Sequence, residues 1–336
     1  MIKSRIGSIL VAGGILIGGI GSAMAAAAPA HPPVKVTIAS FQVGSAWYVY
    51  AATFGRILRD ALPAGSTIDT PPLGGGVANA RLVEAGKATL GLSHTLANRW
   101  AADGTVAYKK KMPHLRALVG GFDTQYLTVV VSGKNKGPDL QQYFKSKPDV
   151  RVDLNPPGSI ATYAGQLELE LAGFGPEQIK KHGGSVKLVP GSVTRDDITS
   201  GRADAYIQIM SIGQPLTTQI AQVHDITILQ PSKKLLQEMH DKYGFSTAVM
   251  PKGSFRGQTE DVTLPSTTTT LVARDDMPDW EAYAITKALC EHKEQMVAAT
   301  RALAGFKPED AWRPDNVNLP LHPGAARYYR ERGWLK

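Results

Sequence analysis

The chain has 336 residues, 43% of them hydrophobic, and its 37 Lys and Arg against 29 Asp and Glu give a net charge of +8. This length is enough for two domains of ordinary size. The single cysteine, Cys290, excludes an intramolecular disulfide. The positive charge is spread thinly, and the one dense run, Lys109–Lys111, has neither interleaved aromatic residues nor a binding motif beside it. The composition therefore argues against a nucleic-acid-binding protein.

The N-terminus has the pattern of a secretory signal. A short basic start precedes an uncharged run, residues 6–20, and the small residues Ala23 and Ala25 occupy the positions that a signal peptidase reads. The run is shorter than the roughly 20 apolar residues that a membrane-spanning helix needs. We expect residues 1–25 to be a cleaved signal peptide and the mature protein to diffuse freely in the periplasm.

From residue 34 the chain alternates β-branched runs with helical patterns. Trp47, Tyr50 and Phe54 recur at helical spacing, which makes Trp47 a core position of a helix or, alternatively, an apolar wall of a binding site. The strands expected in this first block are 34–39, 66–70 and 88–93, and the second helix is 77–86. This order predicts a parallel sheet whose loops gather at the carboxyl ends of its strands, where α/β proteins bind ligands.

A second block repeats the plan, with strands at 150–154, 185–189 and 203–209 and a helix at about 160–172. Two extended stretches rich in β-branched residues, 126–132 and 266–274, are expected to be the crossing strands of a hinge. A helical segment, 278–304, is expected to pack on the first lobe. The predicted fold is α/β with two lobes, each a mainly parallel sheet flanked by helices, and a ligand cleft between them. Lobe I comprises 34–131 plus 265–336, and lobe II comprises 132–264.

The sequence shows no catalytic constellation. Residues 290–292 (Cys-Glu-His) are consecutive and would point in three directions on a helix, so they cannot share a metal ion. Ser45 and Ser159 lack the second glycine of a nucleophile elbow. Residues 74–76 are glycines, but Asn79 stands where a dinucleotide fingerprint needs a third. We therefore expect no enzyme, no metal and no cofactor.

Polar and glycine-rich loops follow the predicted strands of both blocks. Glycine lets backbone N–H groups approach a ligand, and a helix N-terminus favours an anionic oxygen. Any one of these loops could serve only as a turn or a helix cap, but their gathering at strand ends indicates a cleft. The predicted ligand-binding residues are Gly44, Ser45, Tyr48, Gly75, Gly76, Asn79, Ser93 and Thr95 in the first lobe and Ser159, Thr162 and Gln208 in the second.

Three segments carry a more specific pattern: GGGVANARLVEAGKATLGLS at 74–93, NPPGSIAT at 155–162 and LPLHPGAARYYRERGW at 319–334. In these the sequence resembles the TAXI family of TRAP-transporter solute receptors, and the resemblance spans nearly the whole mature chain. It implies an extracytoplasmic receptor that closes over a small solute, often a carboxylate such as glutamate or a 2-oxo acid. Its partner would be a TRAP-type membrane permease driven by an ion gradient.

The first loop departs from the family pattern. Many members read Gly-Thr-Gly-Gly there, whereas Phe41, Gln42 and Trp47 add bulk and an amide to this loop, which leaves the solute open. His94, also uncommon at its position, is either a ligand contact or a loop residue with its own partners. Two other functions stay open. One is a receptor for an ATP-driven importer, which shares this architecture; the other is a periplasmic enzyme on the same scaffold.

Overall fold

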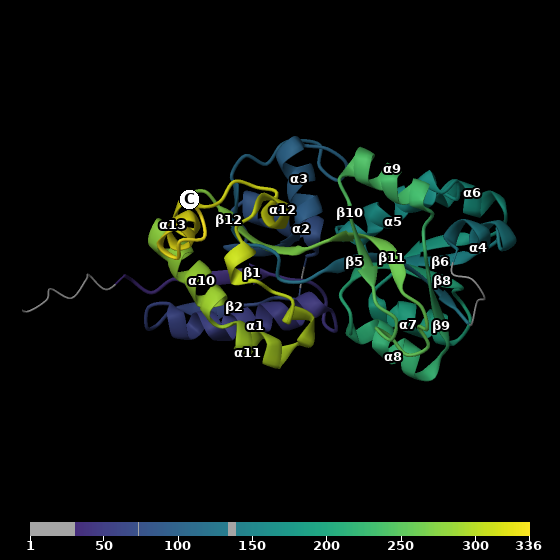
Figure 1. Ribbon diagram of the computed structural model, residues 1–336, viewed down its shortest axis with the longest axis horizontal. Helices are drawn as coiled ribbons and strands as arrows, with labels where there is room; N and C mark the ends of the chain where they lie inside the picture. Colours follow the sequence, from purple (N-terminus) through teal and green to yellow (C-terminus); the bar gives the residue numbers. More distant parts are fainter. Residues whose placement is uncertain (1–30, 73, 134–138) are drawn as a thin grey trace, which may run out of the picture. The chain divides into compact units, whose positions relative to one another are not determined.

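A computed structural model describes residues 31–72, 74–133 and 139–336, nearly all of which belong to one compact unit, Pro33–Lys336. Its strands form two sheets, and Figure 1 shows helices on both faces of each. The α/β fold with two sheets flanked by helices is thus confirmed. The predicted signal peptide, 1–25, lies outside the described residues.

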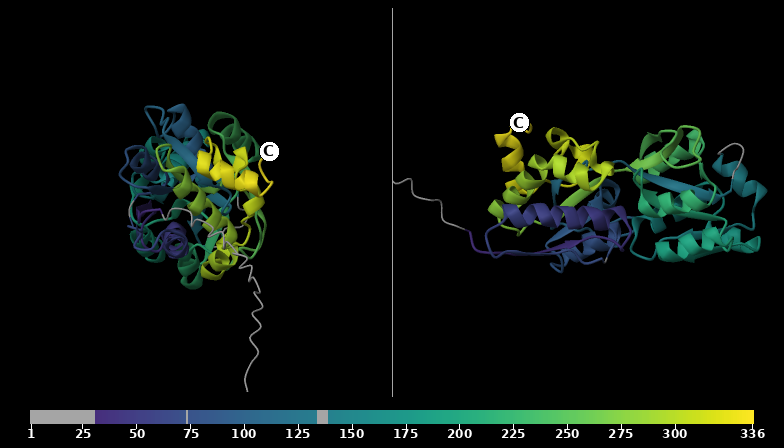
Figure 2. Two further views of the ribbon diagram at one scale, coloured as in Figure 1. Left: turned by 90° about the vertical axis from the view of Figure 1, so that its left-hand side faces the viewer. Right: turned by 90° about the horizontal axis from the view of Figure 1, so that it is seen from below.

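The first sheet is built from four strands of the first part of the described chain, purple to blue in Figure 2, and one strand from its last part, yellow-green in the same figure. Its strand order is β2 (Thr67–Asp69), β1 (Lys35–Ala39), β3 (Leu90–His94), β12 (Thr269–Arg274) and β4 (Leu115–Val119). One face is covered by α1 (Ala46–Ala61), α10 (Asp279–Glu291), α11 (Lys293–Ala299) and α13 (Pro323–Glu331). The other face is covered by α2 (Gly76–Glu84), α3 (Thr95–Asp103) and α12 (Pro314–Val317), and two single turns, η1 (Arg301–Leu303) and η2 (Pro308–Asp310), follow α11.

The second sheet uses the middle of the chain. Its order is β10 (Ser246–Met250), β11 (Val262–Thr267), β5 (Gln125–Ser132), β8 (Ala205–Met210), β6 (Arg151–Leu154) and β7 (Ser185–Leu188), and β9 (Ile226–Leu229) also pairs with β5. On one side lie α4 (Leu140–Ser146), α5 (Ile160–Leu171), α6 (Pro176–Lys181) and α9 (Lys233–Tyr243). On the other side lie α7 (Gly191–Thr199) and α8 (Pro215–Val223).

The core explains why these segments fold as they do. Trp47, Tyr50 and Phe54 are all buried on the face of α1 that packs on the first sheet, as their spacing predicts. In β5 the side chains alternate, so that Val129 packs toward α5 and α9 while Val130 packs toward α7 and α8. Each fully buried side chain of this size contributes about 1.5–3 kcal/mol of transfer free energy.

Both sheets are mixed, which corrects the expectation of mainly parallel sheets. Among the described strands, parallel pairing joins β1 to β2 and β3 and joins β6 to β7 and β8. The expected single strand 266–274 is interrupted at Thr268, and its halves, β11 and β12, enter different sheets. β12 begins beside the end of β3, with Thr269 opposite His94, so it has to run antiparallel to β3.

The pairing of β5 bears on the lobe boundaries. All of its residues pair within the second sheet, whereas the predicted boundary places 125–131 in lobe I. By strand pairing the chain leaves the first sheet after Val119 and returns to it at Thr269. The division at 131 and 265 stays a prediction.

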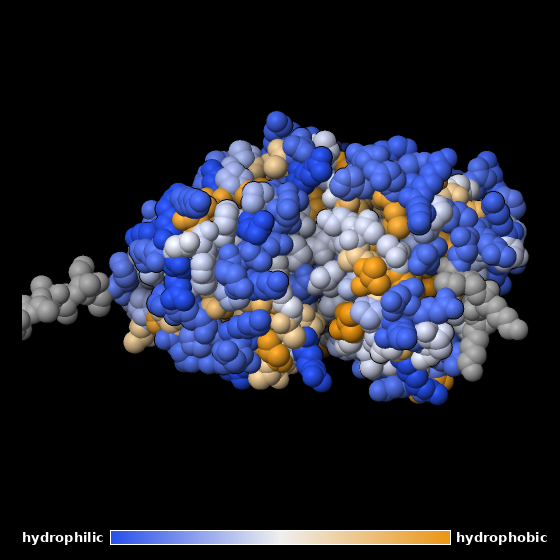
Figure 3. Space-filling model, in the orientation of Figure 1, coloured by the Kyte–Doolittle hydropathy of each residue, from blue (hydrophilic) through white to orange (hydrophobic). Residues whose placement is uncertain are grey.

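The surface has no continuous apolar band on the face drawn in Figure 3, where small orange areas are separated by hydrophilic ones. No helix in the described part of the chain is both long enough and apolar enough to cross a membrane.

Candidate ligand-binding site

A cavity of about 260 Å³ lies where the carboxyl ends of strands from the two sheets meet. The first sheet's side contributes the loop before α1, the start of α2 and His94. The second sheet's side contributes Asn155 after β6, the end of β8 and the starts of α5, α7 and α8. This is where α/β proteins place their ligands, and the volume suits a small molecule.

Six helices of the described chain begin at the wall of this cavity. Ser45 and Ser159 cap α1 and α5 with their hydroxyl oxygens, which accept hydrogen bonds from backbone N–H groups at 3.2 and 3.3 Å. Gln214 caps α8 in the same way, at 2.7 Å. Gly75 and His94 stand at the starts of α2 and α3, and α7 begins at Gly191 in the wall. Each start carries a partial positive charge of about half a unit, so together they favour an anion.

The charges of the lining side chains also favour an anionic ligand. Arg195 and His94 are the titratable residues among those that line the cavity, and no acidic side chain lines it in the described part of the chain. The Nε of Arg195 is 3.1 Å from the carboxylate of Asp196, which lies outside the lining. Burial lowers the pKa of His94 from 6.5 to about 3, so this imidazole is neutral at physiological pH. The wall therefore offers hydrogen-bond donors and one formal positive charge.

His94 forms one flat side of the cavity with Trp47. The two rings are stacked with their centroids 4.3 Å apart, and the indole N–H donates to Thr269 Oγ1 at 2.9 Å. Trp47 is 4% exposed and also lines the cavity, so it is both a core position of α1 and part of the wall. A Cβ at Gly76 would lie 2.8 Å from His94 Nδ1, which explains why a glycine stands there.

The starts of α2 and α5 touch each other across the cavity. The N–H of Ala78, in the first turn of α2, donates to the carbonyl of Gly158 at 3.2 Å. Gly75 has φ +137°, and a Cβ on it would lie 3.0 Å from the same carbonyl oxygen. These backbones approach closely because both positions are glycines.

The structure brings six of the predicted ligand-binding residues to the cavity wall: Gly44, Ser45, Gly75, Gly76, Ser159 and Gln208. The other five lie outside the lining. Asn79, which is fully buried, uses its side chain to support the backbone: Nδ2 donates to the carbonyls of Ser40 and Leu92, and Oδ1 accepts from the N–H of Gly75. Ligand contact by any of these residues remains a prediction.

The remaining four predicted residues have structural surroundings of their own. Thr95 Oγ1 is 2.9 Å from Thr267 Oγ1, and Thr162 Oγ1 donates to the carbonyl of Asn155 at 2.7 Å. Ser93 is fully buried in β3, and Tyr48 is half-buried in the first turn of α1. Ligand contact by these four residues likewise remains a prediction.

Several lining residues were not predicted from the sequence. Gln125 begins β5, Asn155 follows β6, and Ser192 and Arg195 belong to the start of α7. The start of α7 had a signal, because the Pro-Gly-Ser at 190–192 follows a predicted strand as the other loops do. Gln125 had none, since nothing in its neighbourhood marks the end of a crossing strand as part of a cleft.

The described lining of the cavity holds few groups suited to acid–base catalysis. Its one imidazole stays neutral well below pH 6, and no carboxylate in the described lining faces it. Across the described ranges no three His, Cys, Asp or Glu side chains form a metal-binding group. Burial raises the pKa of the Cys290 thiol to about 12, which leaves it without nucleophilic character. This arrangement can bind and orient a molecule.

The sequence model of the NMT1-like family matches residues 38–333. Among solved structures, MatC from Rhodopseudomonas palustris with bound malate aligns with a TM-score of 0.57 at 13% identity, covering 89% of this chain and 99% of its own. The periplasmic binding protein BugD aligns with a TM-score of 0.53 at 14% identity, covering 90% and 96%. The R. palustris protein Rpa4515 with adipate aligns with a TM-score of 0.51 at 14% identity, again covering 90% and 96%. The chain therefore has the fold of periplasmic solute-binding proteins.

Proposed function

The chain belongs to the NMT1-like family, and from this premise we propose that it is an extracytoplasmic receptor that captures a small carboxylate and delivers it to a membrane permease. The observation that carries the proposal is the convergence of six helix starts on a cavity whose described lining holds one arginine and no acidic residue. Such a wall stabilises a negative charge through N–H groups and helix dipoles. The solved structures of similar fold with malate and adipate support the same class of solute.

The partner we propose is a TRAP-type permease, on the strength of the TAXI-like segments at 74–93, 155–162 and 319–334. The fold itself is compatible with other importers. A gene for a large many-helix permease beside this one supports the TRAP assignment, and a neighbouring transport ATPase contradicts it.

Export is part of the proposal. A receptor of this kind works outside the cytoplasmic membrane, and residues 1–25 have the pattern of a signal peptide. Mass spectrometry of a periplasmic extract is expected to find a mature chain that begins at or near Ala26. A full-length chain retained in the cytoplasm would contradict this part of the proposal.

The capture step is tested by a thermal-shift screen of the mature protein against carboxylates and their uncharged primary amides. A ligand at 100 times its dissociation constant adds about 2.7 kcal/mol to the free energy of unfolding, so the binding carboxylates raise the melting temperature. The matched amides are expected to leave it unchanged, because they carry no charge for the helix starts to stabilise. If amides stabilise as well as acids, the anionic site is wrong. If a stabilising acid is consumed during incubation, the protein is an enzyme.

A further inference from the structure

Two buried glutamines, Gln125 and Gln208, contribute amides to the cavity wall. They are 3% and 5% exposed, and they lie at the same edge of the second sheet, at the start of β5 and near the end of β8. An amide can offer a ligand either its NH₂ group or its carbonyl oxygen. The surrounding hydrogen bonds decide which of the two faces the cavity.

The NH₂ group of Gln125 is held by Asp123, whose Oδ2 accepts from Gln125 Nε2. The same carboxylate accepts from the hydroxyl of Tyr50 at 2.7 Å and from the backbone N–H of Thr269 at 3.1 Å. With donors on all sides Asp123 acts as an acceptor, so Gln125 has to turn its NH₂ toward it. No described residue forms a hydrogen bond with Gln125 Oε1, which is the polar atom left for a ligand.

Gln208 is fixed in the same sense. Its Nε2 donates to Thr217 Oγ1 at 2.7 Å, and this oxygen also accepts from the hydroxyl of Tyr206 at 3.1 Å. The Thr217 hydroxyl itself donates a hydrogen bond to the sulfur of Met210, at 3.1 Å. Gln208 Oε1 has no hydrogen-bond partner among the described residues. The two glutamines therefore both present acceptors.

The wall thus divides into two kinds of surface. The helix starts and Arg195 offer donors for an anionic group, whereas Gln125 and Gln208 offer carbonyl oxygens that need a donor from the solute. An ammonium group could supply that donor, but its positive charge would share the cavity with Arg195, and no carboxylate belongs to the described lining. The carboxylate behind Gln125, that of Asp123, already accepts from Gln125, Tyr50 and Thr269. A hydroxyl group supplies the donor without a charge.

We infer, on the basis of the proposed function, that the solute is a hydroxy acid: it carries a neutral hydroxyl that donates to Gln125 or Gln208, and a carboxylate that the helix starts bind. Oxo acids place a carbonyl oxygen against these carbonyl oxygens, and simple acids leave them unpaired. Amino acids bring a positive ammonium group that no carboxylate of the described lining neutralises. All three classes are expected to bind more weakly than the hydroxy acid of the same carbon skeleton.

The test is calorimetric titration of the mature protein with three matched sets of four acids: lactate, propionate, pyruvate and alanine; malate, succinate, oxaloacetate and aspartate; and 2-hydroxyglutarate, glutarate, 2-oxoglutarate and glutamate. In a skeleton that binds, the hydroxy acid is expected to bind about 3- to 10-fold more tightly than the simple acid. The oxo acid should lose about 5- to 150-fold, because its oxygen meets an unpaired acceptor. If a simple, oxo or amino acid binds as tightly as its hydroxy partner, the inference is wrong while the carboxylate receptor stands. If none of the twelve acids binds, both fail.

Variants locate the effect. Gln208→Leu is expected to bring the ratio of the dissociation constants of the hydroxy acid and the simple acid close to one. Gln208→Glu is expected to shift the preference toward the amino acid of the set, because its carboxylate can pair with the ammonium group. Glutamate at this position replaces the NH₂ donor by an oxygen, to which the Thr217 hydroxyl can turn its hydrogen from Met210. Because it keeps the shape of glutamine, it tests the site even where leucine disturbs the fold. The matched control is Gln222→Leu, which makes the same substitution in α8. Gln222 is exposed and lies outside the cavity lining. An unchanged ratio in both Gln208 variants and in Gln125→Leu would overturn the assignment.

Discussion

The starts of α2 and α5 face each other across the cavity, but they satisfy their N–H groups in different ways. α5 is capped by its own Ser159, whose hydroxyl accepts from the N–H of Ala161. α2 has a glycine at its cap position, with no side chain to do this, and the N–H of Ala78 donates instead to Gly158 on the second sheet's side. The start of α5 is therefore complete by itself, whereas the start of α2 is complete only when the other side of the cavity is in place.

Polar residues near the two helix starts look alike in sequence, but those around α2 and those at the start of α5 have different roles. Around α2, Asn79 supports the backbone from behind, and His94 packs against Gly76 while its ring also lines the cavity. At α5, Ser159 stands in the wall itself. We expect substitutions behind α2 to act mainly on folding stability and substitutions at the α5 start to act mainly on binding.

The largest effect is expected from His94, which is packed under the start of α2. Its pKa is about 3 in the folded protein and 6.5 in the unfolded chain, because burial disfavours the charged ring. As the pH falls from 6.5 toward 3 the unfolded chain takes up a proton that the folded protein does not, so the free energy of unfolding falls by about 3 kcal/mol or more. Urea titrations across this range should show a flatter profile for His94→Gln than for the parent. The exposed His182→Gln is the control, and an equal flattening in both would remove His94 as the cause.

Asn79→Ala comes next, with an expected loss of about 3 kcal/mol of unfolding free energy, because it leaves several buried backbone groups without partners. Asn79 is fully buried and bonded to Gly75, Ser40 and Leu92. Urea unfolding measures the loss, and the exposed Gln222→Ala should change stability by less than about 0.5 kcal/mol. A variant that keeps its stability but loses ligand would show Asn79 to be a contact residue after all.

Gly75→Ala tests the contact between the two helix starts. The added Cβ would meet the Gly158 carbonyl at 3.0 Å and Ser159 Cα at 3.3 Å, so we expect about tenfold weaker binding of the carboxylate found in the screen, or roughly 1.4 kcal/mol. Gly173→Ala is the matched control, because it also has a positive φ, +86°, but no atom within 4 Å of the added carbon. Both variants should lose stability through backbone strain, Gly75→Ala the more because its φ of +137° and ψ of 163° are essentially open only to glycine. Only Gly75→Ala should lose affinity. Equal affinities in calorimetry would mean that the two helix starts need not touch.

Ser159→Ala separates capping from binding. Loss of the cap lowers the free energy of unfolding by about 1 kcal/mol. A carboxylate oxygen of the solute that loses its partner also weakens binding by about 1–3 kcal/mol, which raises the dissociation constant roughly 5- to 150-fold. Ser232→Ala removes a cap of the same kind from α9, whose residues Lys233–Tyr243 lie outside the cavity lining. Melting curves should therefore agree for the two variants while calorimetry distinguishes them. Matching affinities would reduce Ser159 to a helix cap.

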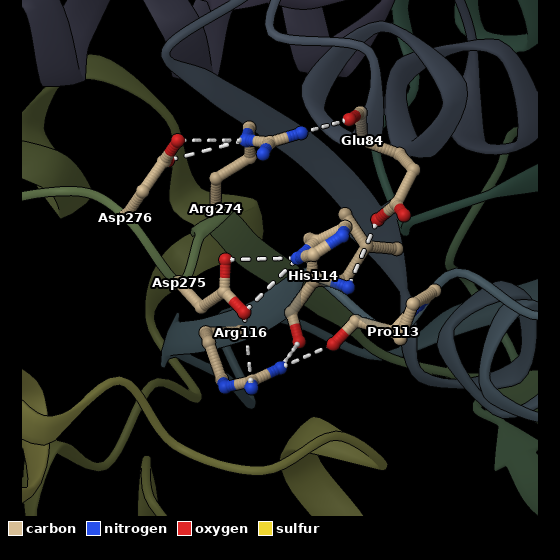
Figure 4. A network of polar contacts seen from close by, with 8 residues as sticks. Glu84, Pro113, His114, Arg116, Arg274, Asp275 and Asp276 are labelled. Carbon is tan, nitrogen blue, oxygen red and sulfur yellow. Dashed lines mark hydrogen bonds and ion pairs between the residues drawn. The ribbon is translucent and has the colours of Figure 1, made fainter.

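The smallest effect is expected in the polar network that Figure 4 shows at the ends of β4 and β12, away from the cavity lining. His114 and Arg116 contact Asp275 at 3.2 and 3.3 Å, and Arg274 contacts Asp276 at 3.1 Å. The His114 ring is about half exposed, so His114→Ala should change the free energy of unfolding by less than about 1 kcal/mol and leave affinity unchanged. A large loss in urea unfolding, or any change in ligand affinity, would show that stability is coupled to the site through this network.

The sequence was sufficient for the main strands and first helices of the two blocks and for the edge where the cavity forms. It did not predict β4, β9 and β10, or the helices α3, α4, α6 and α9. β-branched runs and helical spacing predict strands and helices from local preference, and the order of elements places the loops at strand ends. Gly75, Gly76 and Ser159 follow from that reasoning, because a helix start after a strand needs these residue types whatever the tertiary structure does.

The rest depends on contacts between distant parts of the chain. Asn79 and Ser159 are both polar residues in loops between a strand and a helix, and only the positions of Ser40 and Leu92 decide that Asn79 turns away from the cavity. Gln125 becomes part of the wall because Tyr50, Asp123 and Thr269 meet at the crossing between the sheets. The antiparallel pairing of β12 likewise depends on the place at which the chain re-enters the first sheet. No local sequence pattern predicts that place.

The hydrogen bond between Ala78 and Gly158 involves no atom of a bound solute. It therefore favours the arrangement in which the two helix starts touch, whether the cavity is filled or empty. At about 1 kcal/mol it raises the population of that arrangement roughly fivefold in the absence of solute. A transporter that recognises this arrangement would also meet receptors with no cargo, and this contact makes such unproductive encounters more frequent whatever the affinity for the solute.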